Sequence, residues 1–409
     1  MRRALLISTC FPPITAPEAI LSCKRMGNMP GWEIDVVTIA PIRPTDNDQG
    51  MADYAAQRFR RIERVAPPWP ARLPLPLTWP LFRLPDPVHG AVRRMVIRAE
   101  AFGLENYQVL VSWSHWLSSH LAALELKRRR PEMPWLAHFS DPWADNPYNR
   151  YGPLLRSLNR RMERQVLAAA DALTFTNQQT VDLMLGKAPP AWRRKAHILP
   201  HAFDPDLYPP PAPRVPGLTV ARHVGYFYGS RSPRPLCDAL LALLQRAPAV
   251  LDNLVIELIG GIGRGITPEK ELAALPPGLV QIRKPVNYRQ SLALMRGADL
   301  LILIDAPAET SVFLPSKLID YIGAERPILA ITPRGAAAAV IDEIGGWRAD
   351  PRDVGAIATA LEQALAFART SGNKTFGSAD VRARYSISTL GRRSAELMNE
   401  LVAMKGQHS

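Results

Sequence analysis

The sequence contains little cysteine and no long uncharged hydrophobic run. Its three cysteines (Cys10, Cys23 and Cys237) are an odd number, form no CxxC motif and have no histidine at zinc-ligand spacing. This usage excludes a disulfide framework and predicts a reduced, cytoplasmic chain. Residues 1–9 are too short for the core of a signal peptide. Because no uncharged apolar stretch approaches the ~18–20 residues of a spanning helix, any membrane contact is expected to be peripheral.

The composition is that of a globular protein with an excess of basic residues. Of 409 residues, 47% are hydrophobic and 21% are charged, which excludes a disordered or fibrous protein. This length predicts two or three domains. The 50 Lys+Arg against 37 Asp+Glu give a net charge of +13, so we expect an anionic partner or surface. A nucleic acid would fit this charge, but the chain has no nucleic-acid recognition motif, and no such partner is expected.

Short apolar runs alternate with helical patterns along most of the chain. The expected strands are residues 4–8, 34–39, 109–112, 135–139, 172–176 and 198–200, and then 223–227, 254–259, 280–283, 299–304 and 327–331. Strand–helix alternation at this spacing is typical of parallel sheets with right-handed crossovers. A stretch with prolines 205, 209, 210, 211, 213 and 216 separates the two series. The fold class predicted is therefore α/β, with two doubly wound, Rossmann-like domains facing each other across a cleft.

Residues 58–98 are unusually basic. They contain nine arginines against Glu63 and Asp86, a net charge of +7, together with Trp69, Trp79 and Phe82. Arginine beside tryptophan in an irregular, exposed segment suits an anionic lipid interface. A solvated loop whose aromatic residues face the core explains the same pattern, and both interpretations stay open.

Residues 314–322 follow an apolar strand that ends near Asp305, which places them at the carboxyl edge of the second sheet, where open α/β sheets bind ligands. A helix that starts at Ser316 would direct unpaired backbone N–H groups toward a phosphate. Lys317 adds a point charge for a diphosphate, and Asp320, one turn later, can accept both hydroxyls of a ribose. The alternative is a surface ion pair between Lys317 and Asp320.

Residues 224–234 read as a strand end, a glycine turn and the start of a helix. Gly225 and Gly229 allow the backbone to approach a ligand closely, and the planar guanidinium of Arg231 can bind phosphate. An ordinary strand–helix turn with a solvent-facing arginine is the alternative.

Several segments occur in the order found in one known family. They are residues 10–13 (Cys-Phe-Pro-Pro), 84–87, 112–120, 134–143 (ending in Asp-Pro-Trp), 199–204 and 315–321, the last followed by Arg326 and Pro327. In this order the chain resembles the glycosyltransferases of the GT-B fold, specifically family-4-like retaining enzymes. The resemblance covers nearly the whole chain.

The resemblance implies a metal-independent, hexosyltransferase-like enzyme with no cofactor other than its nucleotide-sugar co-substrate. Its acceptor would be a cell-surface polysaccharide, a lipopolysaccharide or a lipid-linked saccharide, met in the cytoplasm or peripherally at the inner face of the membrane. Residues 1–204 would then bind the acceptor, 205–221 would be the linker, 222–375 would bind the nucleotide sugar and 376–409 would form a C-terminal helical segment.

The resemblance also implies roles for single residues. The acceptor side would be formed by Pro12, Pro13 and Trp143. The transferred sugar would be contacted by Asp141 and by either His115 or His120, between which alignment does not decide. The donor would be bound by Gly225, Gly229, Arg231, Ser316, Lys317 and Asp320.

One departure concerns the first of the family's paired glutamates, which is replaced by Val312. Glu309, Thr310 or Ser311 could supply its role. Two alternatives remain: a nucleotide-sugar epimerase of similar build, and a degenerate GT-B protein that binds nucleotide without transferring sugar.

Overall fold

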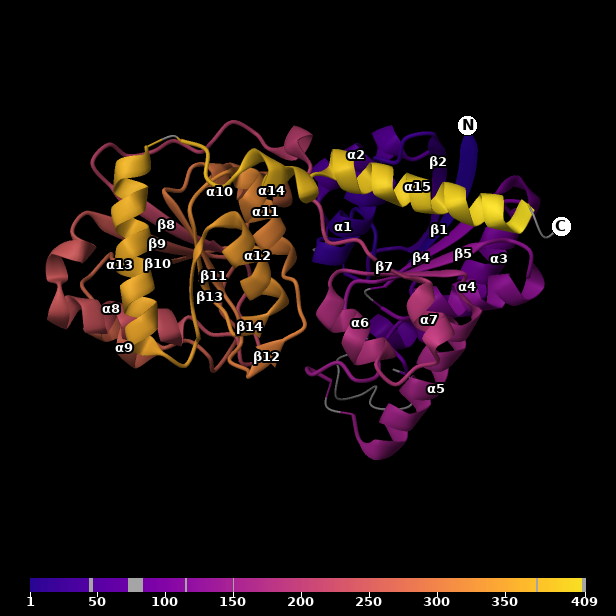
Figure 1. The fold of residues 1–409 in the computed structure, drawn as a ribbon, viewed down its shortest axis with the longest axis horizontal. Helices are drawn as coiled ribbons and strands as arrows, with labels where there is room; N and C mark the ends of the chain where they lie inside the picture. The colour runs from indigo at the N-terminus through magenta and orange to yellow at the C-terminus, as the bar shows by residue number, and fades with distance from the viewer. Residues whose placement is uncertain (44–46, 73–83, 115, 150, 373, 407–409) are drawn as a thin grey trace. The chain divides into compact units, whose positions relative to one another are not determined.

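The computed structural model describes residues 1–43, 47–72, 84–114, 116–149, 151–372 and 374–406 (Figure 1). The chain divides into unit 1, formed by Met1–Ala202 with Ile387–Ser409, and unit 2, formed by Phe203–Ser386. Each unit is built on its own parallel sheet, which confirms the prediction of two doubly wound, Rossmann-like domains.

The sheet of unit 1 has seven parallel strands in the order β3-β2-β1-β4-β5-β6-β7. They are β1 (Arg2–Ser8), β2 (Trp32–Ile39), β3 (Arg61–Val65), β4 (Val109–Trp113), β5 (Trp135–Phe139), β6 (Ala172–Phe175) and β7 (Ala196–Ile198). In the centre, Ala4 pairs with Ile34 of β2 and with Val109 of β4. Because helices cover both faces, β4, β5 and β6 are fully buried, and β1 is buried from Ala4 onward.

The helices of unit 1 follow the strands, and one of them comes from the other end of the chain. They are α1 (Pro17–Met26), α2 (Gln49–Arg58), α3 (Val92–Glu100), α4 (Ser118–Arg129), α5 (Pro153–Ala169), α6 (Gln178–Leu185), α7 (Pro190–Arg194) and α15 (Ile387–Gly406). Helix α15 packs on α1, and Gly391 approaches the carbonyl of Asn28 so closely that a Cβ atom would collide with it (Figure 1).

Unit 2 has a six-stranded parallel sheet in the order β10-β9-β8-β11-β13-β15 and a small pair, β12-β14. The strands are β8 (Thr219–Val224), β9 (Leu254–Ile259), β10 (Val280–Arg283), β11 (Leu300–Ile304), β12 (Thr310–Ser311), β13 (Ile328–Ile331), β14 (Arg334–Gly335) and β15 (Trp347–Ala349). The helices are α8 (Arg234–Arg246), α9 (Glu269–Ala274), α10 (Tyr288–Arg296), α11 (Ser316–Ala324), α12 (Ala336–Ile344), α13 (Val354–Ser371) and α14 (Ala379–Arg384). Both sheets have the βα order in which ligands lie beyond the carboxyl ends of the strands.

The interpretation of residues 58–98 as irregular is wrong for residues 61–65, which form a strand. Arg61–Val65 form β3, the edge strand of unit 1, and Val92–Glu100 form α3. The guanidinium of Arg60 pairs with the buried carboxylate of Asp35, and Arg64 donates to the carbonyl oxygen of Pro12 at 2.7 Å. Trp69 is 69% exposed, while Trp79 and Phe82 lie outside the described residues.

Candidate functional site

The turn that follows β8 is shaped by a glycine with no room for a side chain. Gly225 has φ 146°, a conformation that L side chains rarely adopt, and a Cβ atom there would collide with the ammonium group of Lys317. The predicted strand over residues 223–227 therefore ends at Val224, where the backbone turns. Gly229, four residues later, also has a positive φ of 60° but faces open space.

Lys317 lies in the first turn of α11, behind Pro315, and reaches the β8 turn. Its Nζ is 3.3 Å from Nε2 of His223, which is fully buried at the end of β8. Burial of the ammonium, together with the nearby charge of Arg231, lowers the pKa of Lys317 to about 7. The lysine is therefore held beside the sheet edge without a neighbouring carboxylate strong enough to restore its ordinary pKa.

His223 orients this lysine, and the sequence analysis missed it. Nδ1 of His223 lies 3.0 Å from the carbonyl oxygen of Ile302, so Nδ1 carries the proton and Nε2 accepts from Lys317. Burial and the charge of Lys317 keep the pKa of His223 well below its usual value, and the imidazole is neutral. A histidine in an apolar strand gives no sequence signal for this role, because its partner is 94 positions away.

Arg231 is held by an acid at the end of the neighbouring strand. Its Nη2 donates to Oδ1 of Asp305 at 2.8 Å, and the other oxygen of Asp305 accepts from the hydroxyl of Thr332 at 3.0 Å. Both partners of the ion pair are buried. Lys317 and Arg231 thus share one edge of the unit 2 sheet, where Asp305 balances part of their charge, an arrangement that favours binding of a polyanion.

Asp320 occupies the buried side of α11. Its Oδ1 accepts from the hydroxyl of Tyr288 at 2.8 Å, and its backbone carbonyl accepts from Tyr208 at 2.7 Å. This contradicts the alternative of a surface Lys317–Asp320 ion pair, because Asp320 is 7% exposed and bonds elsewhere. Ser316 begins α11 and is half-buried, whereas Glu309 is exposed just before β12.

In unit 1 the residues predicted for the acceptor side lie after β1 and β5. Pro12 is buried and accepts from Arg64, and the carbonyl of Pro13 accepts from the backbone of Asp48 at 2.7 Å. Trp143 is fully buried, and its indole N–H donates to Asn159 of α5 at 2.8 Å. Asp141, between β5 and Trp143, is half-buried.

Of the two candidate histidines, the structure describes only His120. His115 lies outside the described residues. His120 is fully buried in α4, with its ring against Phe139 (centroids 4.4 Å apart) and its Nδ1 2.8 Å from the hydroxyl of Ser112. Burial lowers the pKa of His120 to about 3, so it is neutral at physiological pH.

Two features are absent from the described residues. No group of three or more His, Cys, Asp or Glu side chains in that part of the chain could hold a metal ion. Within the same residues, no helix combines the length and apolar character needed to cross a bilayer.

The sequence has recognisable relatives. The family model of the glycosyl transferase 4-like domain matches residues 25–202. The D-inositol 3-phosphate glycosyltransferase of Mycolicibacterium smegmatis is 26% identical over 284 residues, which cover 66% of this chain and 62% of that protein. The enzyme of the same name from Salinispora tropica is 25% identical, and the match covers 66% of this chain and 59% of that enzyme. The chain thus spans about three fifths of the length of these curated relatives.

Solved structures share the fold of both units. HepE of Anabaena in complex with UDP has a TM-score of 0.64 at 15% identity, and the match covers 98% of this chain and 100% of HepE. An Escherichia coli trehalose-6-phosphate protein bound with UDP-2-fluoro glucose has a TM-score of 0.62 at 13% identity, with 100% and 99% of the two chains covered.

Proposed function

We propose, on the premise that this chain is a GT-B-fold member of the glycosyl transferase 4-like group, that it transfers a sugar from a UDP-sugar to an acceptor hydroxyl. The observation that supports this most is that Lys317, beside His223, and Arg231, paired with Asp305, both lie at the carboxyl edge of the unit 2 sheet. Structural neighbours with the same fold are solved with UDP or a UDP-sugar, which favours uridine as the base.

The chemistry required is modest. The bond between the anomeric carbon and the diphosphate breaks, a bond from the acceptor oxygen to the same carbon forms, and the acceptor proton is released. Negative charge grows on the diphosphate, and fixed cations aimed at that charge stabilise the transition state. Lys317 and Arg231 supply them with Ser316 at the helix start, and Asp320 accepts from the ribose. We propose that the reaction retains the configuration of the anomeric carbon and uses no resident metal.

For the acceptor we propose a lipid-linked saccharide, a lipopolysaccharide or a polysaccharide, met at the cytoplasmic face of the membrane. The net charge of +13 supports an anionic acceptor environment. The names of the curated relatives give the competing class, a phosphate-bearing polyol. The Pro12–Pro13 turn, which follows β1, and Trp143, which follows β5, are assigned to the acceptor side, and Asp141, at the carboxyl end of β5, is assigned to the sugar.

The decisive experiment measures UDP affinity by calorimetry and sugar transfer from labelled UDP-sugars. Lys317→Ala should weaken UDP binding by roughly one to two orders of magnitude, because a charge-assisted contact contributes about 1.5–3 kcal/mol. An unchanged UDP affinity would contradict the proposed diphosphate site.

The acceptor panel includes membrane extract and inositol phosphate. Conversion of the UDP-sugar to its epimer without an acceptor would favour an epimerase, and binding without any turnover would favour a degenerate GT-B protein.

A further inference from the structure

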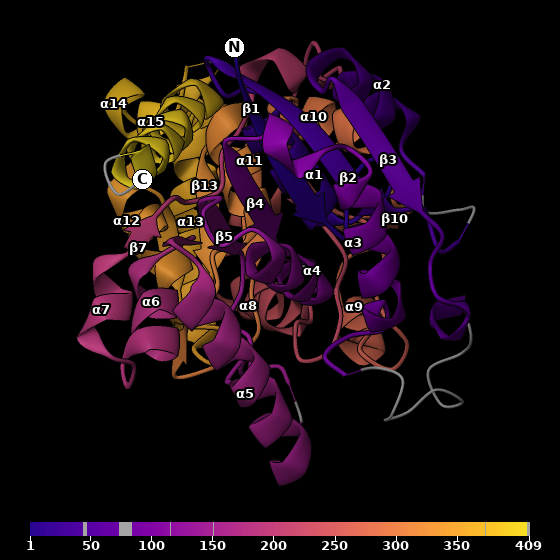
Figure 2. The same cartoon turned by 90° about the vertical axis from the view of Figure 1, so that its right-hand side faces the viewer.

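Helix α5 carries apolar side chains on its outer face, near its first turn. Leu154 is 72% exposed and Leu158 is 37% exposed, and their spacing of four residues places them on one face. Tyr148, in the loop before the helix, is 47% exposed. Figures 1 and 2 show that the first turns of α5 extend beyond the rest of unit 1.

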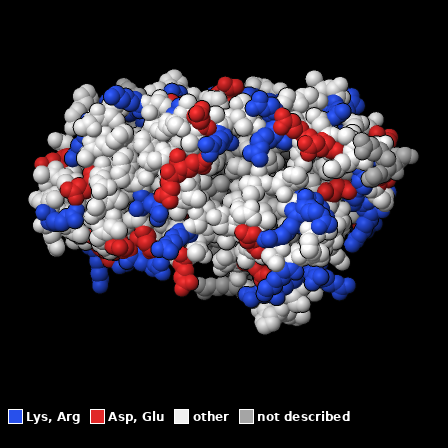
Figure 3. Space-filling view, viewed as in Figure 1, with Lys and Arg blue, Asp and Glu red and all other residues white. Residues whose placement is uncertain are grey.

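Four arginines lie beside and after these leucines along α5. Arg156, Arg160, Arg161 and Arg164 are all exposed. Within the part of the chain that the structure describes, Arg160 alone among them forms an ion pair, with Asp145 at 2.8 Å. In Figure 3 blue side chains lie over α5, while its free end is white. The N-terminal end of α5 is therefore apolar, and positively charged side chains surround the helix next to it.

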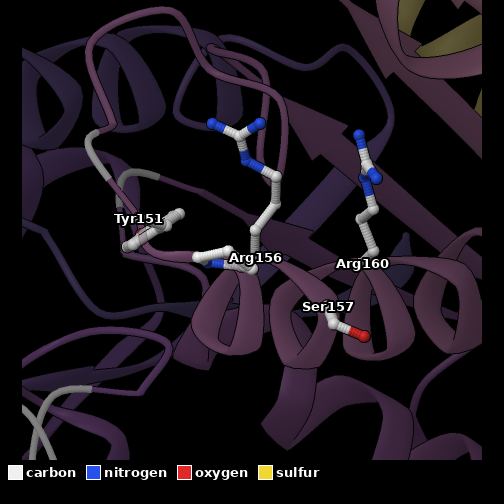
Figure 4. Close-up of a pocket in the computed structure, with 5 residues that line it drawn as sticks. Tyr151, Arg156, Ser157 and Arg160 are labelled. Atoms are coloured by element: carbon white, nitrogen blue, oxygen red, sulfur yellow. The ribbon is translucent and has the colours of Figure 1, made fainter.

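Two hollows lie between these arginines. Figure 4 shows Arg156 and Arg160 projecting from the same side of α5, and with Tyr151 and Ser157 they line a hollow of about 380 Å³. Arg160, Arg161 and Arg164 line a second hollow of about 530 Å³ with Trp192 of α7. Both volumes fall in the range of small-ligand sites, and a guanidinium binds phosphate through two parallel hydrogen bonds.

The inner face of α5 explains why the helix stands firmly in this position. Asn159 accepts from the indole of Trp143, and Glu163 accepts from the backbone N–H of Ala144 at 2.9 Å. The only acid within α5 is therefore turned inward, which leaves the outer face cationic.

We propose that the N-terminal end of α5 docks unit 1 on an anionic lipid bilayer, with Leu154 and Leu158 inserted and the arginines around the helix on lipid phosphates. Charge complementarity selects this occupant, because exposed leucines near three arginines that form no ion pair with any described residue fit the boundary between acyl chains and anionic headgroups. The docking does not depend on sugar transfer. It also moves the membrane contact away from β3, where Arg60 and Arg64 bond within unit 1.

Binding of the whole protein to vesicles of phosphatidylglycerol with phosphatidylcholine tests this, with pure phosphatidylcholine as the neutral reference. The triple variant Arg156→Gln, Arg161→Gln, Arg164→Gln should bind on the order of a hundredfold more weakly, at roughly fivefold per arginine. Leu154→Ser with Leu158→Ser should remove the binding that persists in high salt, since inserted apolar groups are not screened.

The matched control is the second basic helix of the same unit. Arg93→Gln, Arg94→Gln and Arg98→Gln remove the same charge from α3 and should leave vesicle binding within about threefold of wild type. UDP affinity, measured on every variant, reports whether unit 2 is intact. An equal loss for the α3 and α5 triples, or no wild-type binding to anionic vesicles, overturns the proposal.

A labelling experiment avoids charge changes altogether. Because Cys10, Cys23 and Cys237 are buried, a polarity-sensitive maleimide dye should react selectively at Leu154→Cys or at Ile97→Cys on α3. The fluorescence emission of the dye at position 154 should shift to shorter wavelength on anionic vesicles, and the emission of the dye at position 97 should not. A shift at 97 alone contradicts docking through α5, as does binding equally strong to acidic protein and to vesicles.

Discussion

With a pKa of about 7, Lys317 is partly protonated at neutral pH, and only its charged form attracts a diphosphate. His223 receives this ammonium through a neutral nitrogen, so it positions the lysine without neutralising it. An incoming diphosphate would supply the missing negative charge and restore the ordinary lysine pKa. Donor binding is therefore expected to take up a proton above neutral pH.

We expect UDP affinity to fall as pH rises above about 7, approaching tenfold per pH unit, because a growing fraction of Lys317 must be protonated on binding. Lys317→Arg keeps its charge across this range and should bind with a much flatter pH profile. Calorimetry over a pH series that spans neutrality measures both slopes. Equal slopes would assign the dependence to another group.

Asp320→Asn keeps the shape of the side chain and removes its charge. We expect a larger loss of affinity for UDP than for 2′- or 3′-deoxy-UDP, because only the ribose offers both hydroxyls to the carboxylate. Tyr288→Phe, which removes the hydroxyl donating to Asp320, should reproduce part of the loss. Equal losses for all three nucleotides would indicate that Asp320 acts within unit 2 and not on the ribose.

At the scale of elements, most of the buried strands and the edge strand β10 were predictable, whereas the edge strand β3 was not. β1, β9 and β11 are built mainly of apolar residues, and their predicted positions agree with the structure to within two residues. β3 reads Arg-Ile-Glu-Arg-Val, and its exposed edge position lets charged residues occupy a strand, so its composition indicated a loop. α11 was predictable because Pro315 and the apolar residues after it signal a helix start.

Residues of the candidate site were predictable only where the neighbouring sequence indicates their role. Lys317 and Arg231 follow recognisable turns, whereas His223 and Asp305 acquire their roles from strand neighbours far away in the chain. Trp143 illustrates the converse, because the Asp-Pro-Trp motif identifies the residue but not its fully buried position against α5.

Helix α5 should make stability depend on pH through Glu163. Burial raises its pKa from 4.5 to about 7, so the native state holds this proton more tightly than the unfolded chain. The resulting stabilisation is fully present below pH 4.5 and is lost as pH rises through about 7, about 3 kcal/mol in all.

Glu163→Gln keeps an acceptor for Ala144 and should remove this loss, which leaves the variant more stable than wild type above neutral pH. Urea unfolding across the same pH range checks it, with the exposed Glu396→Gln of α15 as the matched control. Parallel pH profiles for wild type and Glu163→Gln would contradict the assignment.

At the scale of the whole molecule, unit 1 depends on a helix that the chain contributes after unit 2. Gly391→Ala should destabilise unit 1 by about 1–3 kcal/mol, since the added methyl would meet the Asn28 carbonyl. Gly406→Ala, in open space on the same helix, should be neutral or slightly stabilising. Thermal unfolding separates the two variants, and UDP affinity should stay unchanged in both because the nucleotide residues belong to unit 2.

The return of α15 to unit 1 has a consequence for biosynthesis. A ribosome adds about 5–20 residues per second, so the 184 residues from Phe203 to Ser386 separate the last strand of unit 1 from α15 by roughly 10–40 s. During that interval the nascent α1 surface that later receives α15 has no partner from its own chain, while unit 2 emerges with all of its strands in sequence. Unit 2 is therefore expected to mature first, and the nascent first unit is the part that a trigger-factor-like chaperone would have to shield.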